Sequence, residues 1–418
     1  MNSTPEKQEK NRIRDLPRNI WVVSLTSFFM DISSEMVINI LPLFLVNVLG
    51  VRTSIVGLIE GIAESTASLV KLFSGWLSDR MHSRKWLAVI GYSLSAFSKP
   101  FFLIASTWEM VAGVRWLDRV GKGIRTAPRD ALIADSIDEK RRGMAFGLHR
   151  AADTAGAFVG ILIAVGVIWF AQANSLYLTK YTFQIVVLIS LVPAFLAVLT
   201  LIIYSREVVS SGQRKMPKFA FKALGKPFMT FMVIAGVFTL GNSSDAFLTL
   251  RAQSAGMTVV QILVMMMVFN LVYSLISTPA GILSDRIGRR RMIIGGWLVY
   301  SLIYFGFAIA QAGWQIFGLY ITYGFYYGLT YGTINAMLAD LVPAEVRGTA
   351  YGSYNAMIGI IAFPASLIAG ILWQGMGAWT GFGYSAPFLF GGCMSLFAVI
   401  LMVTWMPKPA AGKLDRNI

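Results

Sequence analysis

The stretch Gly75–Lys85, GWLSDRMHSRK, recurs in the second half of the chain as GILSDRIGRRR, Gly281–Arg291. A second pair follows at nearly the same spacing: ADSIDEKRRGMAFG, Ala134–Gly147, recurs as ADLVPAEVRGTAYG, Ala339–Gly352. Each copy is a short charged turn between two long apolar stretches. The repeats therefore predict a duplicated helical bundle in which both halves carry the same two turns.

The composition places this bundle in a membrane. Hydrophobic residues make up 56% of the 418-residue chain, charged residues make up only 14%, and the mean hydropathy is +0.63. A soluble domain cannot bury so much apolar surface. Because a helix of about 20 apolar residues spans a bilayer, the sequence predicts an all-α integral membrane protein with twelve transmembrane helices. The spans are expected at residues 18–49, 54–80, 85–106, 108–136, 143–172, 181–205, 228–251, 258–285, 291–311, 313–341, 348–376 and 384–406.

Lysine and arginine gather on one side of the predicted bundle. They fill the N-terminal tail, the turns after the second and fourth spans and the linker between the halves. By the positive-inside rule, both termini and the linker are expected in the cytoplasm, with the protein in the cell (inner) membrane. No cleavable signal is expected, because the first span is too long for a signal-peptide core. The expected parts are a tail (1–17), a six-helix bundle (18–205), a linker (206–227), a second six-helix bundle (228–406) and a tail (407–418).

Several classes of function are disfavoured by the residue counts. The net charge of +15 follows mainly from the topological bias, so nucleic acid is not an expected partner. Cys393 is the single cysteine, and the two histidines have no partner spacing, so no metal, cofactor or catalytic residue is expected. The expected partners are a small-molecule substrate, protons and the lipid bilayer, and the chain is expected to act as a monomer.

The repeated turn resembles the signature Gly-x-Leu-Ser-Asp-Arg-x-Gly-Arg-Arg of the major facilitator superfamily. The second copy matches throughout, whereas His82 and Ser83 stand in the first copy where Gly-Arg is expected. Twelve spans in two six-helix halves around a basic linker extend the resemblance over essentially the whole chain. The resemblance implies two pseudo-symmetric bundles that rock about a central cavity, which opens alternately to each side of the membrane.

The repeated turns are the predicted cytoplasmic gate. An Asp at a helix end can accept backbone N–H bonds, and glycines let helices approach closely. Arg84 or Arg80 is expected to pair with Asp135, and Arg289 with Asp340. The predicted gate residues are Gly75, Asp79, Arg80, Arg84, Asp135, Gly281, Asp285, Arg286, Arg289 and Asp340. The alternative is that these charges only fix the topology.

Ionisable residues inside the spans concentrate in the first half, and their cost in lipid makes them candidates for function. A carboxylate beside cations in a partly dry cavity can change its protonation with substrate or conformation. The predicted proton-coupling residues are Asp31, Glu35, Glu64, Asp153 and His149. Asp31 and Glu35 lead this set because the first span lines the cavity in the superfamily. Alternatively, His149 is a hydrogen-bonded structural group; Glu60 is expected near the outer mouth, in water.

The fourth span carries a stripe of cations on one helical face, because Arg115, Arg119, Lys122 and Arg129 follow at i, i+4, i+7 and i+14. Cations on the fourth and fifth spans outnumber carboxylates on the first, fourth and fifth. This excess predicts a positive cavity and a substrate with an anionic group. The alternative is a self-neutralised structural network. The predicted substrate-binding residues are Arg115, Asp118, Arg119, Lys122, Arg125, Arg150, Tyr323, Tyr327, Asn335 and Asn355.

The sequence thus predicts a secondary active transporter that moves a small organic solute by alternating access, coupled to protons. Its substrate is expected to be an anionic or zwitterionic amphiphile or a metal chelate. A broad drug–proton efflux antiporter stays open, since the second half is rich in aromatic residues and Met. The antiporter signature Gly-Pro-x-x-Gly-Gly is incomplete, because the fifth span has Gly156-Ala157-Phe158-Val159-Gly160-Ile161. A non-transporting sensor on the same fold is the remote alternative.

Overall fold

The computed structural model describes residues 13–81, 84–138, 141–207, 224–343 and 346–407. The described chain is built from fourteen α-helices and two short 3-10 helices. They match the twelve predicted spans, because the first and seventh spans are each made of two consecutive helices. Most of the predicted linker and tails, and the side chains of Asp79 and Arg80, lie outside the described part.

The helices of the first half begin and end within a few residues of the predicted spans. They are η1 (Ile13–Asp15), α1 (Arg18–Ile38), α2 (Leu41–Asn47), α3 (Thr53–Met81), α4 (Arg84–Ser98), η2 (Lys99–Leu103), α5 (Trp108–Asp135), α6 (Arg142–Gln172) and α7 (Lys180–Tyr204). The second half repeats this order. Its helices are α8 (Gly225–Gly241), α9 (Ala246–Ser254), α10 (Val259–Ile287), α11 (Arg289–Ile309), α12 (Gly313–Leu341), α13 (Arg347–Gln374) and α14 (Ser385–Thr404).

Nine of the helical spans in the described residues are long and apolar enough to cross a membrane. The long helices α3, α5 and α12 fall outside this set. Both α3 and α5 carry several charged side chains, which lower their hydropathy. The two most polar spans of the first half therefore need a polar neighbourhood inside the protein.

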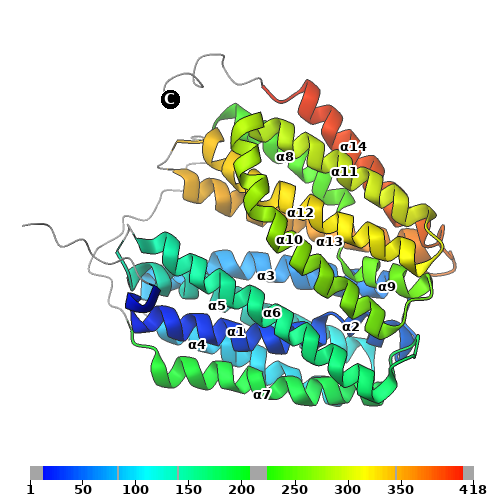
Figure 1. Ribbon diagram of the computed structural model, residues 1–418, viewed down its shortest axis with the longest axis horizontal. Helices are drawn as coiled ribbons and strands as arrows, with labels where there is room; N and C mark the ends of the chain where they lie inside the picture. Colours follow the sequence, from blue (N-terminus) through cyan, green and yellow to red (C-terminus); the bar gives the residue numbers. More distant parts are fainter. Residues whose placement is uncertain (1–12, 82–83, 139–140, 208–223, 344–345, 408–418) are drawn as a thin grey trace, which may run out of the picture.

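The helices form two groups, α1–α7 and α8–α14, which lie against each other (Figure 1). Across their interface α3 packs along α13, and α6 packs along α10. The start of α1, the end of α7, the start of α8 and the end of α14 lie at one end of the molecule, here named the termini end (Figure 1). The other end is named the opposite end.

The opposite end is closed by contacts between the halves. The cross-half hydrogen bonds there include Arg52 Nη1 to Gly377 O (2.8 Å), Thr53 N to Gln374 Oε1 (2.6 Å) and Gln253 Nε2 to Leu176 O (2.7 Å). Close packing adds to them, because a Cβ on Gly57 of α3 would collide with the backbone carbonyl of Ser366 in α13. The two helices therefore touch backbone to backbone at this point.

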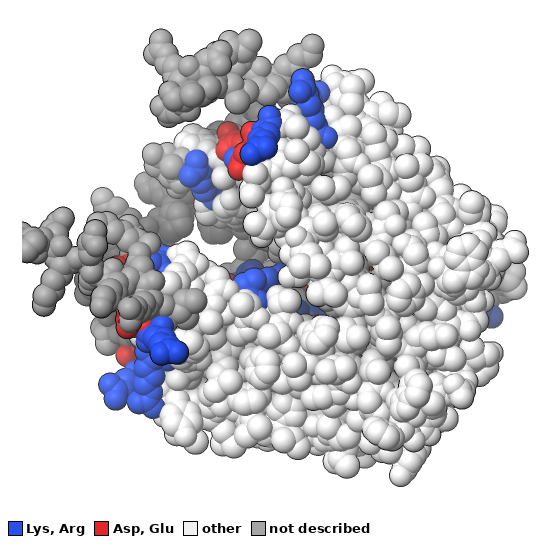
Figure 2. Space-filling model, viewed as in Figure 1, with Lys and Arg blue, Asp and Glu red and all other residues white. Residues whose placement is uncertain are grey.

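At the termini end the halves separate. Figure 2 shows a hollow between them on this side, with Lys and Arg side chains inside it. The same view shows a flank that is almost free of charge, with the visible charges gathered at the termini end. The described conformation is therefore open at the termini end and closed at the opposite end.

Candidate functional site

The central cavity lies between the halves where two helices break. In the first half α1 ends at Ile38 and α2 begins at Leu41, and in the second half α8 ends at Gly241 and α9 begins at Ala246. The breaks hold Asn39 and Asp245, which are separated along the chain by the same distance as Gly75 and Gly281. Both halves thus interrupt their first span at the same point, as discontinuous helices do at transporter binding sites.

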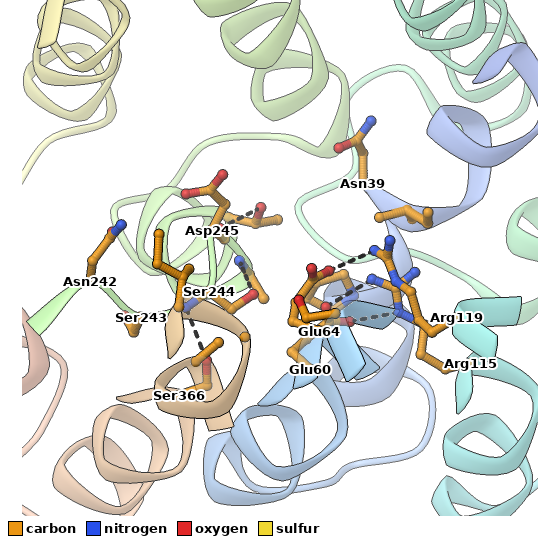
Figure 3. A pocket seen from close by; sticks show the side chains of 18 of the residues that line it. Asn39, Glu60, Glu64, Arg115, Arg119, Asn242, Ser243, Ser244, Asp245 and Ser366 are labelled. Carbon is orange, nitrogen blue, oxygen red and sulfur yellow. Dashed lines mark hydrogen bonds and ion pairs between the residues drawn. The ribbon is translucent and has the colours of Figure 1, made fainter. Parts of the chain in front are cut away.

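The cavity has a volume of about 430 Å³ and is lined from both halves. Its polar and charged lining residues are Glu35, Asn39, Glu60, Glu64, Ser68, Arg115, Arg119, Thr239, Asn242, Ser243, Ser244, Asp245, Thr249, Tyr327 and Ser366. Figure 3 shows that the ionised groups of α3 and α5 face the polar break between α8 and α9 across this space. The volume suits a small organic molecule.

The first half contributes a buried ion pair between α5 and α3. Arg115 donates from Nε to Glu60 Oε1 at 3.2 Å and from Nη2 to Glu60 Oε2 at 2.9 Å. The two side chains are only 2% and 7% exposed. The remaining guanidinium nitrogen of Arg115, Nη1, lies 3.8 Å from Asp118 Oδ2. This bidentate arrangement fixes the orientation of both groups at the base of the cavity.

One helical turn further along α5, Arg119 forms a second pair. Its Nη2 atom lies 2.9 Å from Glu64 Oε1, and the Glu64 side chain is 45% exposed whereas that of Arg119 is 6% exposed. Glu35 of α1 also lines the cavity, where its Oε2 accepts a hydrogen bond from Asn39 Nδ2 at 2.9 Å. Both guanidinium groups of the lining therefore already have carboxylate partners, while Glu35 has an amide partner.

The second half contributes one carboxylate among amides, hydroxyls and aromatic rings. Asp245 Oδ1 accepts a hydrogen bond from Tyr323 Oη at 3.2 Å. Beside it, Ser244 N donates to Ser366 Oγ at 3.2 Å, which ties the α8–α9 break to α13. Tyr327 lines the cavity and packs edge-to-face against Tyr323, with ring centroids 5.2 Å apart. This wall offers aromatic surface next to an acid.

The predicted coupling residues separate into two groups. Glu35 and Glu64 line the cavity, whereas Asp31, His149 and Asp153 are not among its lining residues. His149 is 3% exposed, and its Nε2 atom lies 3.5 Å from Asp153 Oδ2 on the same helix. Whether any of these residues carries protons stays a prediction.

The predicted substrate-binding residues are also divided. Arg115, Arg119 and Tyr327 line the cavity, and Tyr323 lies directly behind it. The remaining ones are not among its lining residues: Asp118, Lys122, Arg125, Arg150, Asn335 and Asn355. Arg125 instead lies over the Tyr92 ring, 4.6 Å from its centroid, and Asn355 Nδ2 donates to the backbone oxygen of Tyr351.

Two sequence expectations about charge are wrong. Glu60 does not lie in water at an outer mouth, because it is 5% exposed and paired with Arg115. The excess of cations is not found in the lining either, where four carboxylates stand against two guanidinium groups. The count from the sequence sets the cations of the fourth and fifth spans, α5 and α6, against the carboxylates of the first, fourth and fifth spans. It therefore omits the glutamates of α3 and the aspartate before α9. Glu60 and Glu64 pair with two cations of the stripe, Arg115 and Arg119.

At the gate, the structure contains both kinds of ion pair predicted from the repeats. Arg84 Nε lies 2.7 Å from Asp135 Oδ2, and Arg289 Nε lies 2.7 Å from Asp340 Oδ2. Arg289 also lies 3.5 Å from Asp285 Oδ1. Each pair lies within one half, so in this open conformation they join helices of the same bundle. Arg286 is exposed.

The expected close helix approach is seen at only one of the two gate glycines. A Cβ on Gly75 would touch Ala127 of α5 at 3.4 Å, whereas a Cβ on Gly281 would meet no atom within 4 Å. The close approach expected at Gly281 is therefore not found in this conformation. The gate function of both turns stays a prediction.

The sequence reasoning missed Asn242, Ser243, Ser244 and Asp245 as site residues. The run Gly241-Asn-Ser-Ser-Asp245 is a signal that could have found them, since a glycine and four polar residues interrupt an otherwise apolar span. It also missed Lys99, which is 3% exposed in the first half and donates to Ser33 Oγ at 2.5 Å and Ser34 Oγ at 3.2 Å.

Comparisons with known proteins agree with this architecture. The family model of the Major Facilitator Superfamily matches residues 23–366. The MFS-type transporter MJ1317 of Methanocaldococcus jannaschii is 34% identical over 396 residues, which cover 93% of this chain and 95% of that protein. A multi-drug resistance efflux pump PmrA homolog of Lactococcus lactis is 24% identical, covering 85% of this chain and 89% of that protein.

Among solved structures, the nucleoside transporter NupG superposes with a TM-score of 0.75. It shares 14% sequence identity and covers 94% of this chain and 100% of that chain, so the likeness concerns the fold. The paired halves, the interrupted first helix of each half and the family match all agree with the resemblance seen in the repeated turns. The chain belongs to the major facilitator superfamily: it is a multi-pass membrane transporter for a small-molecule substrate, and not an enzyme.

Proposed function

We propose that this transporter exchanges protons for an amphiphilic substrate that carries a positively charged group, alone or in a zwitterion. The observation that carries the proposal is the charge of the cavity lining, where both guanidinium groups are engaged by Glu60 and Glu64. Glu35 and Asp245 are the further carboxylates of the lining, one from each half. They are the groups that a substrate cation or a proton would neutralise.

Competition for the same carboxylates gives a simple coupling mechanism. An acid in a partly dry cavity is stabilised either by a proton or by a bound cation, and not by both at once. A cation that enters from the open side would therefore displace protons from Glu35 and Asp245. After the halves rock, protons arriving from the other side would displace the cation. The substrate and the protons move in opposite directions in this cycle.

The direction of transport follows from the orientation that we propose. Lys and Arg gather at the termini end, and this bias favours a cytoplasmic location for both termini and for the linker. The cavity then faces the cytoplasm, and antiport with inward-moving protons exports the substrate. The likeness to a multi-drug resistance efflux pump homolog supports this reading. In the cycle, residues 18–205 and 228–406 move as the two bundles.

Transport by purified protein in liposomes tests the proposal. Ethidium and carboxyfluorescein serve as a matched pair of probes, since both are fluorescent aromatic molecules and they differ in the sign of their charge. We expect a pH gradient to drive movement of ethidium through the wild-type protein, and the Glu35→Gln variant to lose the dependence on the gradient. Gradient-driven movement of carboxyfluorescein alone would contradict the proposal.

An organic-anion carrier is the second candidate. One observation favours it: Glu64 is 45% exposed, so a substrate carboxylate could replace it on Arg119. Lys122 lies one turn further along α5 and is exposed. In that case Lys122→Gln should weaken binding of carboxyfluorescein by about 1.5–3 kcal/mol, the scale of a charge-assisted hydrogen bond, and leave binding of a neutral analogue unchanged.

A further inference from the structure

A groove runs along the flank of the first half, away from the central cavity. Its floor is α1, and its walls are α6 and α7, which lie on either side of α1 in Figure 1. The groove has a volume of about 540 Å³. Trp21 and Leu25 of the floor are 43% and 45% exposed, so the groove presents a contiguous apolar surface together with Val22 and Phe28.

The groove exists because α1 and α6 diverge towards the termini end. Further along they touch backbone to backbone, since a Cβ on Gly156 would lie 2.5 Å from the backbone oxygen of Phe28. A Cβ on Gly160 would lie 2.5 Å from that of Ile32. Before this contact, the wall of α6 consists of Leu148 and the small Ala152. The groove is therefore an apolar wedge that narrows and ends at Phe28.

The length of the groove matches one leaflet of a bilayer. From Arg18 to Phe28 the helix rises by about 15 Å, at about 1.5 Å per residue. The hydrocarbon core of a bilayer is about 30 Å thick, so the groove extends from the interface to about its middle. An acyl chain of the leaflet at the termini end has this reach.

The outer end of the groove is cationic. The Arg18 guanidinium lies 5.6 Å from the centroid of the Tyr204 ring, which belongs to the wall of α7. Arg206 is held next to it, because its backbone N donates to Asn19 Oδ1 at 2.9 Å and its carbonyl accepts from Asn19 Nδ2 at 2.9 Å. Arg14 is exposed just before α1. In Figure 2 Lys and Arg side chains gather at the end of this flank, next to an uncharged surface.

We propose that this groove binds an anionic phospholipid of the leaflet at the termini end. One acyl chain lies in the wedge between α6 and α7, against Trp21 and Leu25. The phosphate lies at the interface, where Arg18 and Arg206 bind it through guanidinium–phosphate hydrogen bonds. The site is independent of the central cavity, so it stands whether or not the proposed substrate is correct.

Native mass spectrometry of the full-length protein tests the site. The protein is reconstituted with phosphatidylglycerol or with phosphatidylcholine of identical acyl chains, and the lipid retained on the released protein is counted. We expect wild-type protein to retain phosphatidylglycerol. Since each cation near the surface contributes about 1 kcal/mol, the loss of two cations in the R18Q/R206Q variant should reduce the retained phosphatidylglycerol about thirtyfold.

Two further variants make the outcome specific. Lys226→Gln removes a cation near the start of α8, which corresponds to the start of α1, and should leave retention unchanged. Ala152→Phe fills the wedge while all the cations remain, and should reduce retention as strongly as the charge variant. Equal retention of the two lipids by wild-type protein, or equal retention of phosphatidylglycerol by wild type and all three variants, would overturn the proposal.

Discussion

The wall of the cavity formed by α1–α7 carries five charged side chains, Glu35, Glu60, Glu64, Arg115 and Arg119, whereas the wall formed by α8–α14 carries Asp245 alone. The halves share their helix order, their repeated turns and the position of their broken first helix. The halves differ in the side chains that they carry at equivalent positions around the cavity. Duplication thus preserved the framework that moves, while the side chains at its centre diverged into a charged wall and an aromatic, hydroxyl-rich wall.

The charged wall depends on ion pairs for its stability as well as for its chemistry. Arg115 and Glu60 are nearly inaccessible to water, so the charge of each would be buried without a counter-charge if the other were removed. The facing wall has no such requirement at Tyr327, whose ring packs against other rings. Mutations should therefore cost more stability in the first half than in the second, and four predictions follow this difference from large effects to small.

Arg115→Gln should give the largest loss. Removing the guanidinium leaves Glu60 charged and buried, which costs about 3–5 kcal/mol of unfolding free energy. Chemical denaturation in detergent micelles measures it. Arg119→Gln is the matched control one turn away, and it should cost less because its partner Glu64 is 45% exposed and can be hydrated. If both variants lost the same unfolding free energy, the explanation that burial of the carboxylate partner sets the loss would be contradicted.

The gate pairs allow the same comparison between halves. Arg84 and Asp135 are 6% and 7% exposed, whereas Arg289 and Asp340 are 29% and 54% exposed. Asp135→Asn should therefore lower the free energy of unfolding by about 3 kcal/mol or more. Asp340→Asn should lower it by about 0–1 kcal/mol, because water already solvates and screens that pair. The same denaturation assay decides the matter, and a reversed order of the two losses would refute this explanation.

The carboxylates at the centre should affect binding more than stability. Glu35→Gln and Asp245→Asn should each weaken ethidium binding by about 1.5–3 kcal/mol, the scale of a hydrogen bond to a charged group. Lys122→Gln should leave ethidium binding unchanged or strengthen it. Titration of tryptophan fluorescence with ethidium measures all three. A loss in Lys122→Gln that matches the loss in Glu35→Gln would argue for the anion carrier instead.

The smallest effects concern the contact between the halves. Gly57→Ala introduces a methyl group against the backbone of Ser366, and overpacking of this kind costs about 1–3 kcal/mol. Since the contact lies in the closed part of the interface, the variant should shift molecules away from the conformation that is open at the termini end. Gly281→Ala is the control, because open space surrounds Gly281 here. The rate at which a thiol reagent labels a cysteine introduced in place of Ser68, which lines the cavity, measures the shift. Equal labelling rates in the two variants would contradict the assignment of Gly57 to a closed interface.

Much of the fold could be predicted from the sequence, because long apolar segments and repeated turns report directly on membrane helices. The pairs Arg84–Asp135 and Arg289–Asp340 could be predicted as well, since both partners lie in repeated motifs. The contents of the cavity could not. Helical spacing showed that Arg115 and Arg119 share a face, but it does not show that α3 brings Glu60 and Glu64 against that face.

The position of Asp245 illustrates the same limit. In an uninterrupted helix, spacing along the chain would give the face on which Asp245 lies, but the break between α8 and α9 places it in the lining of the cavity, where it accepts a hydrogen bond from Tyr323. The groove between α6 and α7 is a second example. It depends on the angle at which helices diverge, and the apolar pattern of α1 alone does not encode this angle.

Proton release on substrate binding tests the central claim most directly. Ethidium is added to purified protein in weakly buffered detergent solution that contains a pH indicator, over a range of acidic to neutral pH. If cation and proton compete for Glu35 and Asp245, wild-type protein should release protons as ethidium binds, and binding should weaken as the pH falls. The Glu35→Gln/Asp245→Asn variant should release none. Tight ethidium binding without proton release by the wild-type protein at every pH, or equal release by the double variant, would contradict the account.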